Sequence, residues 1–498
     1  MYKGADTEVL VVGAGFAGLS VAGGLDPDKC IILDRGEKLD LGAASAAFAR
    51  HQSGARHILD FAPSVAAERF ALESKLAGNR VSLPLSGMSC NAYSYVQGGI
   101  SNWWGGYASR LTDETLAMDG VISWPLSQRD INPFVTRAEG LLHVHGDPRL
   151  PNRGYAGAMA GYDIWSELLK NVFPAAHVTP EAKNVTSIKE QKIGLCSGVG
   201  HCAICINDAK ARPENCFEPR TIFNCTRVNA ILFEDRRATS VIAETQGEVF
   251  EIGFETLVVA AGGLENVALL QRSALPKDVR SDLIGRFYQD HTACEILIEM
   301  PFDMPWLAMG AECHIELPEL SGYFHGIEVR TLMLSIPIEA IHARPLMLKA
   351  YGPKDLEGVR KMVRRTARLY LQLEIPPEWD LQVRSSGHEA YIYTMPYLKN
   401  IGILDMVTHE IVGKLRDRGL TPLHVFPHYR DGFGGHHYSG TTPMSRTENA
   451  VVDPTQRLHG TDNVYINGAS VIPRCGGAGP TLTLTALGLR LGMHLAGA

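Results

Sequence analysis

The sequence lacks three features, and each absence excludes a class of protein. It has no window of about 18 uninterrupted apolar residues, so we expect no transmembrane helix. It has no excess of basic residues, since its formal net charge is −7, so we expect no nucleic-acid partner and no general affinity for anionic membranes. The strand-like run 8–12 begins too early to leave room for a signal peptide, so we expect a cytoplasmic protein whose ten cysteines are reduced.

The composition is that of a globular protein with an unusual number of glycines. The chain has 498 residues, enough for two or more domains of roughly 100–200 residues each. Its hydrophobic fraction of 45% and charged fraction of 20% are ordinary values. The 50 glycines favour many turns and a ligand site lined by backbone.

Residues 7–34 have the pattern of a dinucleotide-binding unit, in which an apolar strand, a glycine turn and a helix of small residues lead into a second apolar strand. Gly13, Gly15 and Gly18 fit the G-x-G-x-x-G spacing. Its glycines serve the turn, the approach of a pyrophosphate and the packing of helix on strand. Asp34, about 20 residues on, is placed to accept hydrogen bonds from a ribose diol, which disfavours NADP. The pattern alone fits both NAD and FAD.

Two later glycine segments are candidates for the same ligand. Residues 95–111 read YVQGGISNWWGGYASRL, where two glycine pairs bracket Ser101, Asn102, Trp103 and Trp104. Such a loop either lies flat against a planar ring system or forms a tight structural turn around core tryptophans. Further on, an apolar strand ends at Gly262-Gly263 before a helix, and we expect this second strand–glycine–helix unit to return to the dinucleotide.

The stretch 436–489 carries the candidate catalytic groups. His436 and His437 precede a Gly-Thr turn, and the strand VYIN then leads to Gly468-Ala469. A Gly-rich loop, 476–479, follows, and Pro480 opens a helix whose free N–H groups suit an electron-rich ligand group. Neutral imidazole, with a pKa near 6.5, can act as a base at pH 7, although a lone histidine is more often structural.

A cysteine-rich loop spans 194–216. Cys196, Cys202 and Cys205 have the spacing C-x5-C-x2-C, and Cys216 follows. Closely spaced thiols in a glycine-containing loop can ligate an iron–sulfur cluster or zinc. The spacing matches neither the usual ferredoxin run nor a zinc finger, so the segment is read either as a metal site or as a loop of reduced cysteines.

Residues 293–400 change character to alternating segments that indicate an antiparallel sheet. Within this region, residues 355–370 are basic and amphipathic, and we interpret them as a helix with a solvated charged face. Another helix is expected over 402–419.

Taken in order, these motifs resemble those of the glucose–methanol–choline (GMC) family of FAD oxidoreductases, in particular its pyranose-oxidase-like members and bacterial dehydrogenases. The resemblance rests on GAGFAGL with Asp34-Arg35-Gly36, GGISNWWGG, VVAAGGLEN, IGRFYQDH, HHYSGTTPM and GPTLTLTALGLR. It implies an α/β fold, α+β overall, with a Rossmann-like FAD-binding domain and a substrate domain built on an antiparallel sheet. The implied division is 1–292 and 431–498 for the FAD domain, and 293–430 for the substrate domain.

The same resemblance implies the site residues. His437 matches the histidine that removes the hydroxyl proton, and His436, one residue out of register, is the second catalytic candidate. The residues expected at the cofactor are Gly13, Gly15, Phe16, Ala17, Gly18, Asp34, Arg35, Gly99, Ser101, Asn102, Trp104, Gly105, Gly106, Ala261, Gly262, Gly468, Ala469, Pro480 and Thr481. Iron–sulfur ligation by Cys196, Cys202 and Cys205 would resemble a cysteine loop of some bacterial sugar dehydrogenases in the family.

The sequence departs from the family at two informative positions. Gly479 stands where one subgroup has a catalytic Asn in G-A-N-P-T-L-T. Trp103 stands where some pyranose oxidases have the histidine that is joined to the flavin, so we expect non-covalent FAD. We therefore expect an FAD-dependent enzyme that oxidises a CH–OH group of a small alcohol-type metabolite, such as a sugar or a natural-product intermediate, and passes electrons to O₂ or to an external acceptor or partner protein. The alternatives are non-alcohol chemistry on the same fold (desaturation, C–C cleavage or a redox-neutral lyase reaction) and an electron-transfer flavoprotein subunit.

Overall fold

The computed structural model describes most of the chain, and all structural statements concern these residues. They are 7–38, 82–85, 88–91, 96–102, 104–145, 167–184, 208–303, 314–334, 365–387, 389–394, 396–431, 434–447 and 449–497.

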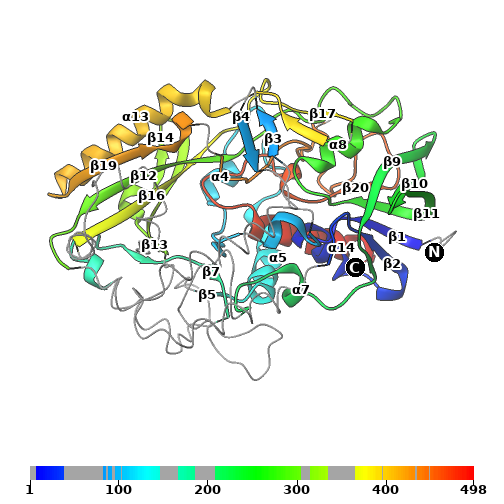
Figure 1. Ribbon diagram of the computed structural model, residues 1–498, viewed down its shortest axis with the longest axis horizontal. Helices are drawn as coiled ribbons and strands as arrows, with labels where there is room; N and C mark the ends of the chain where they lie inside the picture. The colour runs from blue at the N-terminus through cyan, green and yellow to red at the C-terminus, as the bar shows by residue number, and fades with distance from the viewer. Residues whose placement is uncertain are drawn as a thin grey trace.

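The first sheet is assembled from both ends of the chain (Figure 1). Strand β1 (Thr7–Val12) lies parallel to β2 (Cys30–Leu33) on one side and to the end of β11 (Glu248–Val259) on the other. β20 (Val464–Ile466) adds a parallel strand beside β11. The outer strands are β8 (Ile222–Phe223), β9 (Thr226–Glu234) and β10 (Arg237–Thr245), the last two forming an antiparallel meander with β11.

Helices from the two chain ends pack closely against this sheet and each other. α1 (Phe16–Ala22) follows β1, and α14 (Thr481–Leu495) packs on both α1 and α5 (Gln128–Leu141). The approach is so close that a Cβ at Gly492 of α14 would overlap the carbonyl oxygen of Val21 in α1. α8 (Glu265–Arg272) follows β11.

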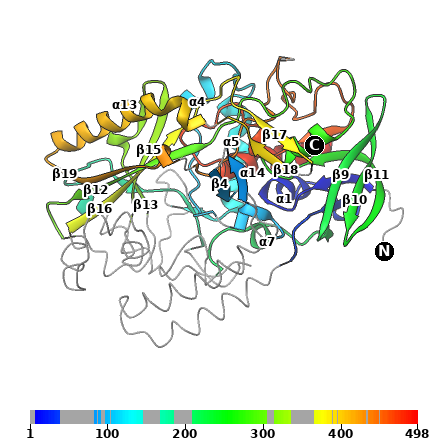
Figure 2. The ribbon, with the colours of Figure 1, turned by 45° about the horizontal axis from the view of Figure 1, so that its top comes forward.

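The second sheet is antiparallel and has the order β19-β12-β16-β15-β13-β6, with β14 beside β15. Its strands are β19 (Thr421–Pro427), β12 (His291–Glu299), β16 (Thr366–Glu374), β15 (Ile327–Leu334), β13 (His314–Glu316), β6 (His177–Val178) and β14 (Gly322–Phe324). α13 (Pro396–Asp417) lies along this sheet, as Figures 1 and 2 show. Among the described helices, none has the length and apolarity needed to cross a membrane.

Strand β16 has one apolar face, which packs in the core, and one polar face. Leu369, Leu371 and Leu373 alternate with Arg368, Tyr370 and Gln372, and successive side chains in a strand point to opposite faces. The leucines are fully buried in the core. The polar set faces the other way, toward the cavity described below.

The interpretation of 355–370 as a basic helix is wrong for its C-terminal part. Thr366–Glu374 is strand β16, and Arg368 is buried rather than solvated. The period-2 alternation of this segment outweighs its charge run, because Arg368 finds a buried carboxylate partner in Glu295. Residues 355–364 lie outside the described residues. The helix expected over 402–419 is confirmed as part of α13.

The remaining elements are short. They are β3 (Ser82–Leu85), β4 (Met88–Asn91), α4 (Asp113–Ala117), β5 (Val144–His145), β7 (Glu181–Ala182), α7 (Pro213–Cys216), β17 (Val383–Ser386), β18 (Glu389–Ile392), and the 3₁₀ turns Pro27–Lys29, Gly99–Asn102, Pro318–Leu320, His428–Asp431 and Ala469–Val471.

The contact between α1 and α14 predicts opposite effects for two helix glycines. Gly492→Ala should lower the free energy of unfolding by roughly 1–3 kcal/mol, because its Cβ must displace backbone of α1. Gly413→Ala in α13, where an added Cβ meets nothing within 4 Å, should raise it by roughly 0.5–1 kcal/mol through helix propensity. Chemical denaturation of the two variants measures both, and equal effects would show that α1 and α14 do not pack this closely.

Candidate active site

One elongated cavity of about 590 Å³ lies between the two sheets and receives residues from both ends of the chain. Its first-sheet wall contains sixteen of the nineteen residues expected at the cofactor. They are Gly13, Gly15, Phe16, Ala17, Asp34, Arg35, Gly99, Ser101, Trp104, Gly105, Ala261, Gly262, Gly468, Ala469, Pro480 and Thr481. His436 and His437 line the same cavity.

The turn between β1 and α1 shows why glycines occupy these positions. Gly13 has φ +108, and a Cβ there would overlap the carbonyl oxygen of Ala260. A Cβ at Gly18 would overlap the carbonyl oxygen of Gly13, so this third glycine permits helix α1 to pack on the turn. Gly15 begins the helix on the cavity wall, and the first-turn N–H group of Phe16 donates to Ser101 Oγ at 3.4 Å.

Asp34 is tied to backbone at both of its carboxylate oxygens. Oδ2 accepts a hydrogen bond from Ala14 N at 2.8 Å, and Oδ1 accepts one from Gly36 N at 2.8 Å. Burial raises the pKa of this carboxyl, while these backbone N–H groups act in the opposite direction. Asp34 therefore braces the glycine turn as well as lining the cavity. Beside it, Arg35 Nη1 pairs with Glu265 Oε1 of α8 at 2.9 Å.

The loop 98–107 is held against the cavity from outside. Lys210 is 1% exposed, and its Nζ donates to the carbonyl oxygens of Asn102 and Trp104, both at 2.9 Å. Trp104 Nε1 donates to Ala211 O at 2.8 Å, and its ring packs edge-on against Phe16 at 5.4 Å. The loop is thus both a structural turn and a wall of the site.

Three residues expected at the cofactor do not line the cavity. Gly18 serves helix packing. Asn102 donates through Nδ2 to Gln97 O and Gly99 O, which stabilises the turn that contains it. Gly106 is buried with φ +87, and its carbonyl accepts from Ala182 N at 2.7 Å. These three residues stabilise the backbone around the cavity and do not line its surface.

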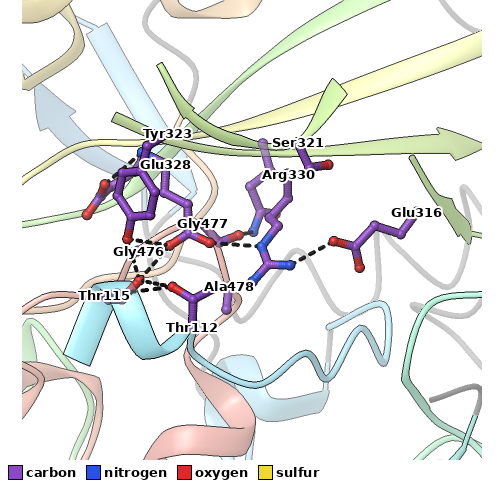
Figure 3. Close-up of polar contacts among 12 residues, drawn as sticks. Thr112, Thr115, Glu316, Ser321, Tyr323, Glu328, Arg330, Gly476, Gly477 and Ala478 are labelled. Atoms are coloured by element: carbon purple, nitrogen blue, oxygen red, sulfur yellow. Dashed lines mark hydrogen bonds and ion pairs between the residues drawn. The ribbon is translucent and has the colours of Figure 1, made fainter. Parts of the chain in front are cut away.

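The glycine loop before α14 is positioned by a charged network on the second sheet (Figure 3). Arg330 pairs with Glu328 at 3.0 Å and with Glu316 at 2.7 Å. Glu328 Oε2 also accepts hydrogen bonds from Thr115 Oγ1 at 2.6 Å and from the Tyr323 hydroxyl at 3.1 Å. Burial favours protonation of Glu328, but Arg330 and these hydroxyl groups outweigh it and lower its pKa.

The network encloses Gly476 so tightly that no side chain fits. Gly476 has φ +61, and a Cβ there would overlap Glu328 Oε2. On the following residue, Gln372 Nε2 donates to Gly477 O at 2.8 Å. The direction of the Gly476 carbonyl is therefore set by the second sheet, although the loop belongs to the C-terminal segment.

That carbonyl begins a hydrogen-bonded chain that ends at His437. His291 Nε2 lies 2.6 Å from Gly476 O, and His291 Nδ1 lies 2.8 Å from His437 Nδ1. A carbonyl oxygen only accepts, so His291 must carry its proton on Nε2 and accept at Nδ1. His437 must then donate from Nδ1, which leaves a lone pair on Nε2.

His437 Nε2 is the free end of this chain. It has no hydrogen-bond partner among the described residues, and His437 is half-buried on the cavity wall. Burial lowers the pKa of His437 well below its ordinary value, with a further contribution from the neighbouring His291 and His436. Burial also lowers the pKa of His291 to about 4, against its hydrogen bond to Gly476. Both rings are therefore neutral at pH 7.

The Asp290 carboxylate connects the backbones of His291 and His437. Its Oδ1 accepts from His437 N at 2.8 Å and from His291 N at 2.7 Å, and its Oδ2 accepts from the Tyr288 hydroxyl at 3.0 Å. Burial raises the pKa of Asp290 to about 6, although these donors oppose the shift. His436 is turned differently, with φ +60 and Nδ1 2.7 Å from the Tyr438 hydroxyl.

Gly479 lies directly beside the His437 ring. A Cβ at Gly479 would be 3.8 Å from His437 Cε1, 3.9 Å from His437 Nε2 and 3.7 Å from Tyr107 O, all ordinary van der Waals distances. Its φ is not in the left-handed region. Neither backbone conformation nor packing requires glycine here, so the missing side chain leaves open space at the imidazole.

Several cavity residues come from the second sheet and were not expected from the sequence. They are His314, Leu332, Arg368, Tyr370 and Gln372, on strands β13, β15 and β16. The signal that could have found three of them is the alternation R-L-Y-L-Q-L-E along 368–374. His291 was noted only as part of a connecting segment, yet it begins β12 and contacts His437. Cys196, Cys202, Cys205 and Trp103 lie outside the described residues.

The cavity fits a dinucleotide whose far end is an electron-rich ring. The start of α1 and the start of α14 both line it, and neither helix has a side-chain cap. Gly13 and Gly262 line it with positive φ, and at Gly13 the backbone of Ala260 leaves no room for a side chain. A Rossmann-like sheet joined to an antiparallel sheet, with an imidazole nitrogen between them that has no partner among the described residues, is an arrangement suited to a flavin-dependent oxidoreductase.

Comparison with known proteins shows which sequences the chain is similar to. Residues 350–488 match the family model described as GMC oxidoreductase. A C-glycoside 3-oxidase of Microbacterium trichothecenolyticum is 25% identical over 302 residues, 55% of this chain and 54% of that protein. A putative GMC-type oxidoreductase of Acanthamoeba polyphaga mimivirus is 29% identical over 142 residues, 25% of this chain and 24% of that protein. The chain thus matches about half or less of the length of these curated relatives.

Solved structures show the same fold over the whole chain. Pyridoxine 4-oxidase from Mesorbium loti has a TM-score of 0.64 at 15% identity, covering 99% of this chain and 100% of that one. A formate oxidase of Aspergillus oryzae, studied for modification of its FAD, has a TM-score of 0.63 at 14% identity, covering 100% and 99%. The fold prediction is confirmed, and the similarity to the GMC oxidoreductase family model covers residues 350–488 of the chain.

The cavity geometry predicts a contrast between two of its glycines. Gly13→Ala should weaken FAD binding roughly 5- to 150-fold, because its Cβ overlaps Ala260 at a cost of roughly 1–3 kcal/mol. Gly479→Ala should keep the flavin content of the wild type, because its Cβ meets only van der Waals neighbours. The flavin absorbance of each purified variant, relative to its protein absorbance, measures the contrast. Loss of flavin from Gly479→Ala alone would contradict the geometry.

Proposed function

We propose that this protein is an FAD-dependent oxidoreductase acting on a CH–OH group of a small polar metabolite, with His437 as the base. One observation carries the proposal. The chain Gly476 O–His291–His437 leaves the Nε2 lone pair of a neutral imidazole free on the cavity wall. A neutral imidazole placed in a ligand cavity is suited to accept a hydroxyl proton.

FAD, when bound, would supply the hydride acceptor for the carbinol carbon. The residues that would hold it are those of the first-sheet wall, from the glycine turn at Gly13 to the start of α14 at Thr481. We infer non-covalent binding, since Trp103 stands where some pyranose oxidases have the histidine that is joined to the flavin. The proposed cofactor domain is 1–292 with 431–498, and the proposed substrate domain is 293–430.

The roles of the protein groups follow from their contacts. His437 Nε2 would accept the hydroxyl proton while Nδ1–H stays hydrogen-bonded to His291. The Gly476 carbonyl keeps His291 in the tautomer that can accept this bond. Asp290 fixes the spacing of the two rings through their backbone N–H groups. His436 lies beside the base, and we propose that it assists in substrate contact.

The names of the relatives support a polar alcohol substrate. One is called a C-glycoside 3-oxidase, and a structural neighbour is called a pyridoxine 4-oxidase. For this chain we propose a sugar or natural-product intermediate as donor. The acceptor would be O₂ or an external acceptor or partner protein. An iron–sulfur cluster at Cys196, Cys202 and Cys205 stays a prediction that rests on the sequence.

Gly479 favours a second candidate function. Without a side chain at this position, the cavity lacks the amide that would sit beside His437 in relatives with Asn there. Chemistry other than alcohol oxidation, such as desaturation, C–C cleavage or a redox-neutral elimination, would need the His437 base but not that amide. Substrate turnover without oxygen and without flavin bleaching would favour the redox-neutral form of this candidate.

The proposed base is tested by flavin reduction in the absence of oxygen. The wild-type protein is mixed with D-glucose, an aryl C-glucoside, pyridoxine and benzyl alcohol, and bleaching of the flavin is recorded. For any donor that reduces the wild type, His437→Ala should react about 10²–10⁴-fold more slowly while its oxidised flavin spectrum is retained, because the general base is removed.

His436→Ala is the matched variant, since it removes the neighbouring imidazole from the same wall. We expect its flavin to be reduced at a rate within about tenfold of the wild-type rate, which corresponds to the loss of one hydrogen bond. A wild-type reduction rate in His437→Ala would refute the assignment of the base. A large loss in His436→Ala alone would transfer the role to His436.

A further inference from the structure

A second imidazole on the cavity wall is held by a buried carboxylate. His314 lies on β13 of the second sheet and lines the cavity, and its Nδ1 is 2.5 Å from Glu181 Oε1. Its Nε2 has no hydrogen-bond partner among the described residues. Sequence reasoning did not single out either residue, which are 133 positions apart.

Glu181 is a fixed, ionised acceptor. It is fully buried, and its Oε2 accepts a hydrogen bond from Lys183 Nζ at 2.6 Å. Burial alone would raise the pKa of Glu181, but Lys183 and His314 outweigh this and hold it at about 2. At neutral pH the carboxylate therefore only accepts hydrogen bonds.

The Glu181 carboxylate determines which ring nitrogen of His314 donates a hydrogen bond. Because Glu181 accepts, His314 must donate from Nδ1, and in its neutral form it carries a lone pair on Nε2. The carboxylate also fixes the orientation of the ring, as such partners do for other functional histidines. The cavity thus contains two histidines whose Nε2 atoms are unpaired among the described residues, His437 from the C-terminal segment and His314 from the second sheet.

Tyr107 lies next to a residue beside each of the two histidines. Tyr107 forms an antiparallel β-bridge with Glu181, the residue that holds His314. The carbonyl oxygen of the same Tyr107 would lie 3.7 Å from a Cβ at Gly479, which borders His437. Tyr107 and Gly479 line the same cavity as both histidines.

The wall around His314 offers polar groups without unbalanced charge. Tyr370 and Gln372 line it with Arg368, whose guanidinium is paired in bidentate fashion with Glu295 at 2.8 and 2.6 Å. The Lys183 charge is likewise balanced by Glu181. Such a wall suits neutral hydroxyl groups better than a carboxylate or phosphate, because the cation that would attract an anion already has a carboxylate partner.

We propose that His314, oriented by Glu181, forms a subsite that binds a second hydroxyl group of the substrate while His437 engages the reacting one. The inference rests on the proposed function and narrows its substrate class to polyhydroxylated molecules. His314 acts in binding and in selecting the substrate, whereas His437 acts in the chemical step.

The test compares polyhydroxylated and monohydric donors. Rapid-mixing flavin reduction without oxygen gives a limiting rate and an apparent Kd for D-glucose, an aryl C-glucoside and benzyl alcohol. The wild type should prefer the better sugar donor over benzyl alcohol. His314→Ala should raise the apparent Kd of the sugar donor about tenfold, the loss of one hydrogen bond, and leave the limiting rate nearly unchanged. The apparent Kd of His314→Ala for benzyl alcohol should stay within about threefold of the wild-type value.

Two further variants separate binding from structure. His314→Gln, whose side-chain oxygen can take the place of Nε2, should recover part of the sugar preference. His177→Ala removes a histidine from the neighbouring strand β6 that does not line the cavity, and it should behave as the wild type. Retained flavin absorbance in His314→Ala shows that the fold is intact, as expected because Glu181 and Lys183 still neutralise each other.

The outcomes distinguish this inference from the function on which it rests. If no CH–OH donor reduces the wild-type flavin, the proposed function fails. If the wild type is reduced but prefers benzyl alcohol, or if His314→Ala keeps the wild-type preference for the sugar donor, the function stands and the subsite is refuted. A fall in limiting rate with an unchanged apparent Kd would also refute it.

Discussion

The hydrogen bond from His291 Nε2 to the Gly476 carbonyl is the interaction on which the candidate active site depends. A carbonyl cannot donate, so this one contact sets the tautomer of His291 and, through it, that of His437. The carbonyl is placed in turn by the buried network of Glu328, Arg330 and Thr115, which leaves no room for a side chain at Gly476. Charged residues that do not line the cavity therefore determine which nitrogen of His437 lacks a hydrogen-bond partner among the described residues.

The two sheets contribute different groups to the cavity because their strands present side chains differently. The parallel strands β1, β2 and the C-terminal end of β11 are mostly buried, and glycine turns or helix starts follow β1 and β11. The antiparallel sheet alternates apolar and polar residues, so one face packs in the core while the other supplies Arg368, Tyr370 and Gln372 to the cavity. The proposed cofactor contacts and the proposed substrate contacts therefore come from different kinds of sheet.

Much of the first sheet could be predicted because its signals are local. The spacing of Gly13, Gly15 and Gly18 and the acidic residue at 34 follow from one strand–turn–helix–strand unit. The cavity-lining position of His437 also followed from a short motif. The relation of His437 to His291 and Gly476 could not be predicted, since it joins residues 146 and 185 positions apart.

The second sheet was harder to predict for the same physical reason. The strand β16 was partly mistaken for a helix, because five basic residues within 355–370 outweighed the alternation that begins at Arg368. The pair Glu181–His314 depends on β13 and β7 meeting in space, and nothing near either residue indicates the other. Asn102 and Gly106 were assigned to the cofactor because a motif does not distinguish residues that shape a loop from those that line it.

The central claim is the proton arrangement along Gly476 O, His291 and His437, and a neutron crystal structure of the oxidised protein at neutral pH observes it directly. The account predicts a hydrogen on His291 Nε2, a hydrogen on His437 Nδ1 between the two rings, and none on His437 Nε2. A hydrogen on His437 Nε2 with a bare Nδ1 would contradict it, because the imidazole would then face the cavity as a donor and could not accept a proton from a substrate.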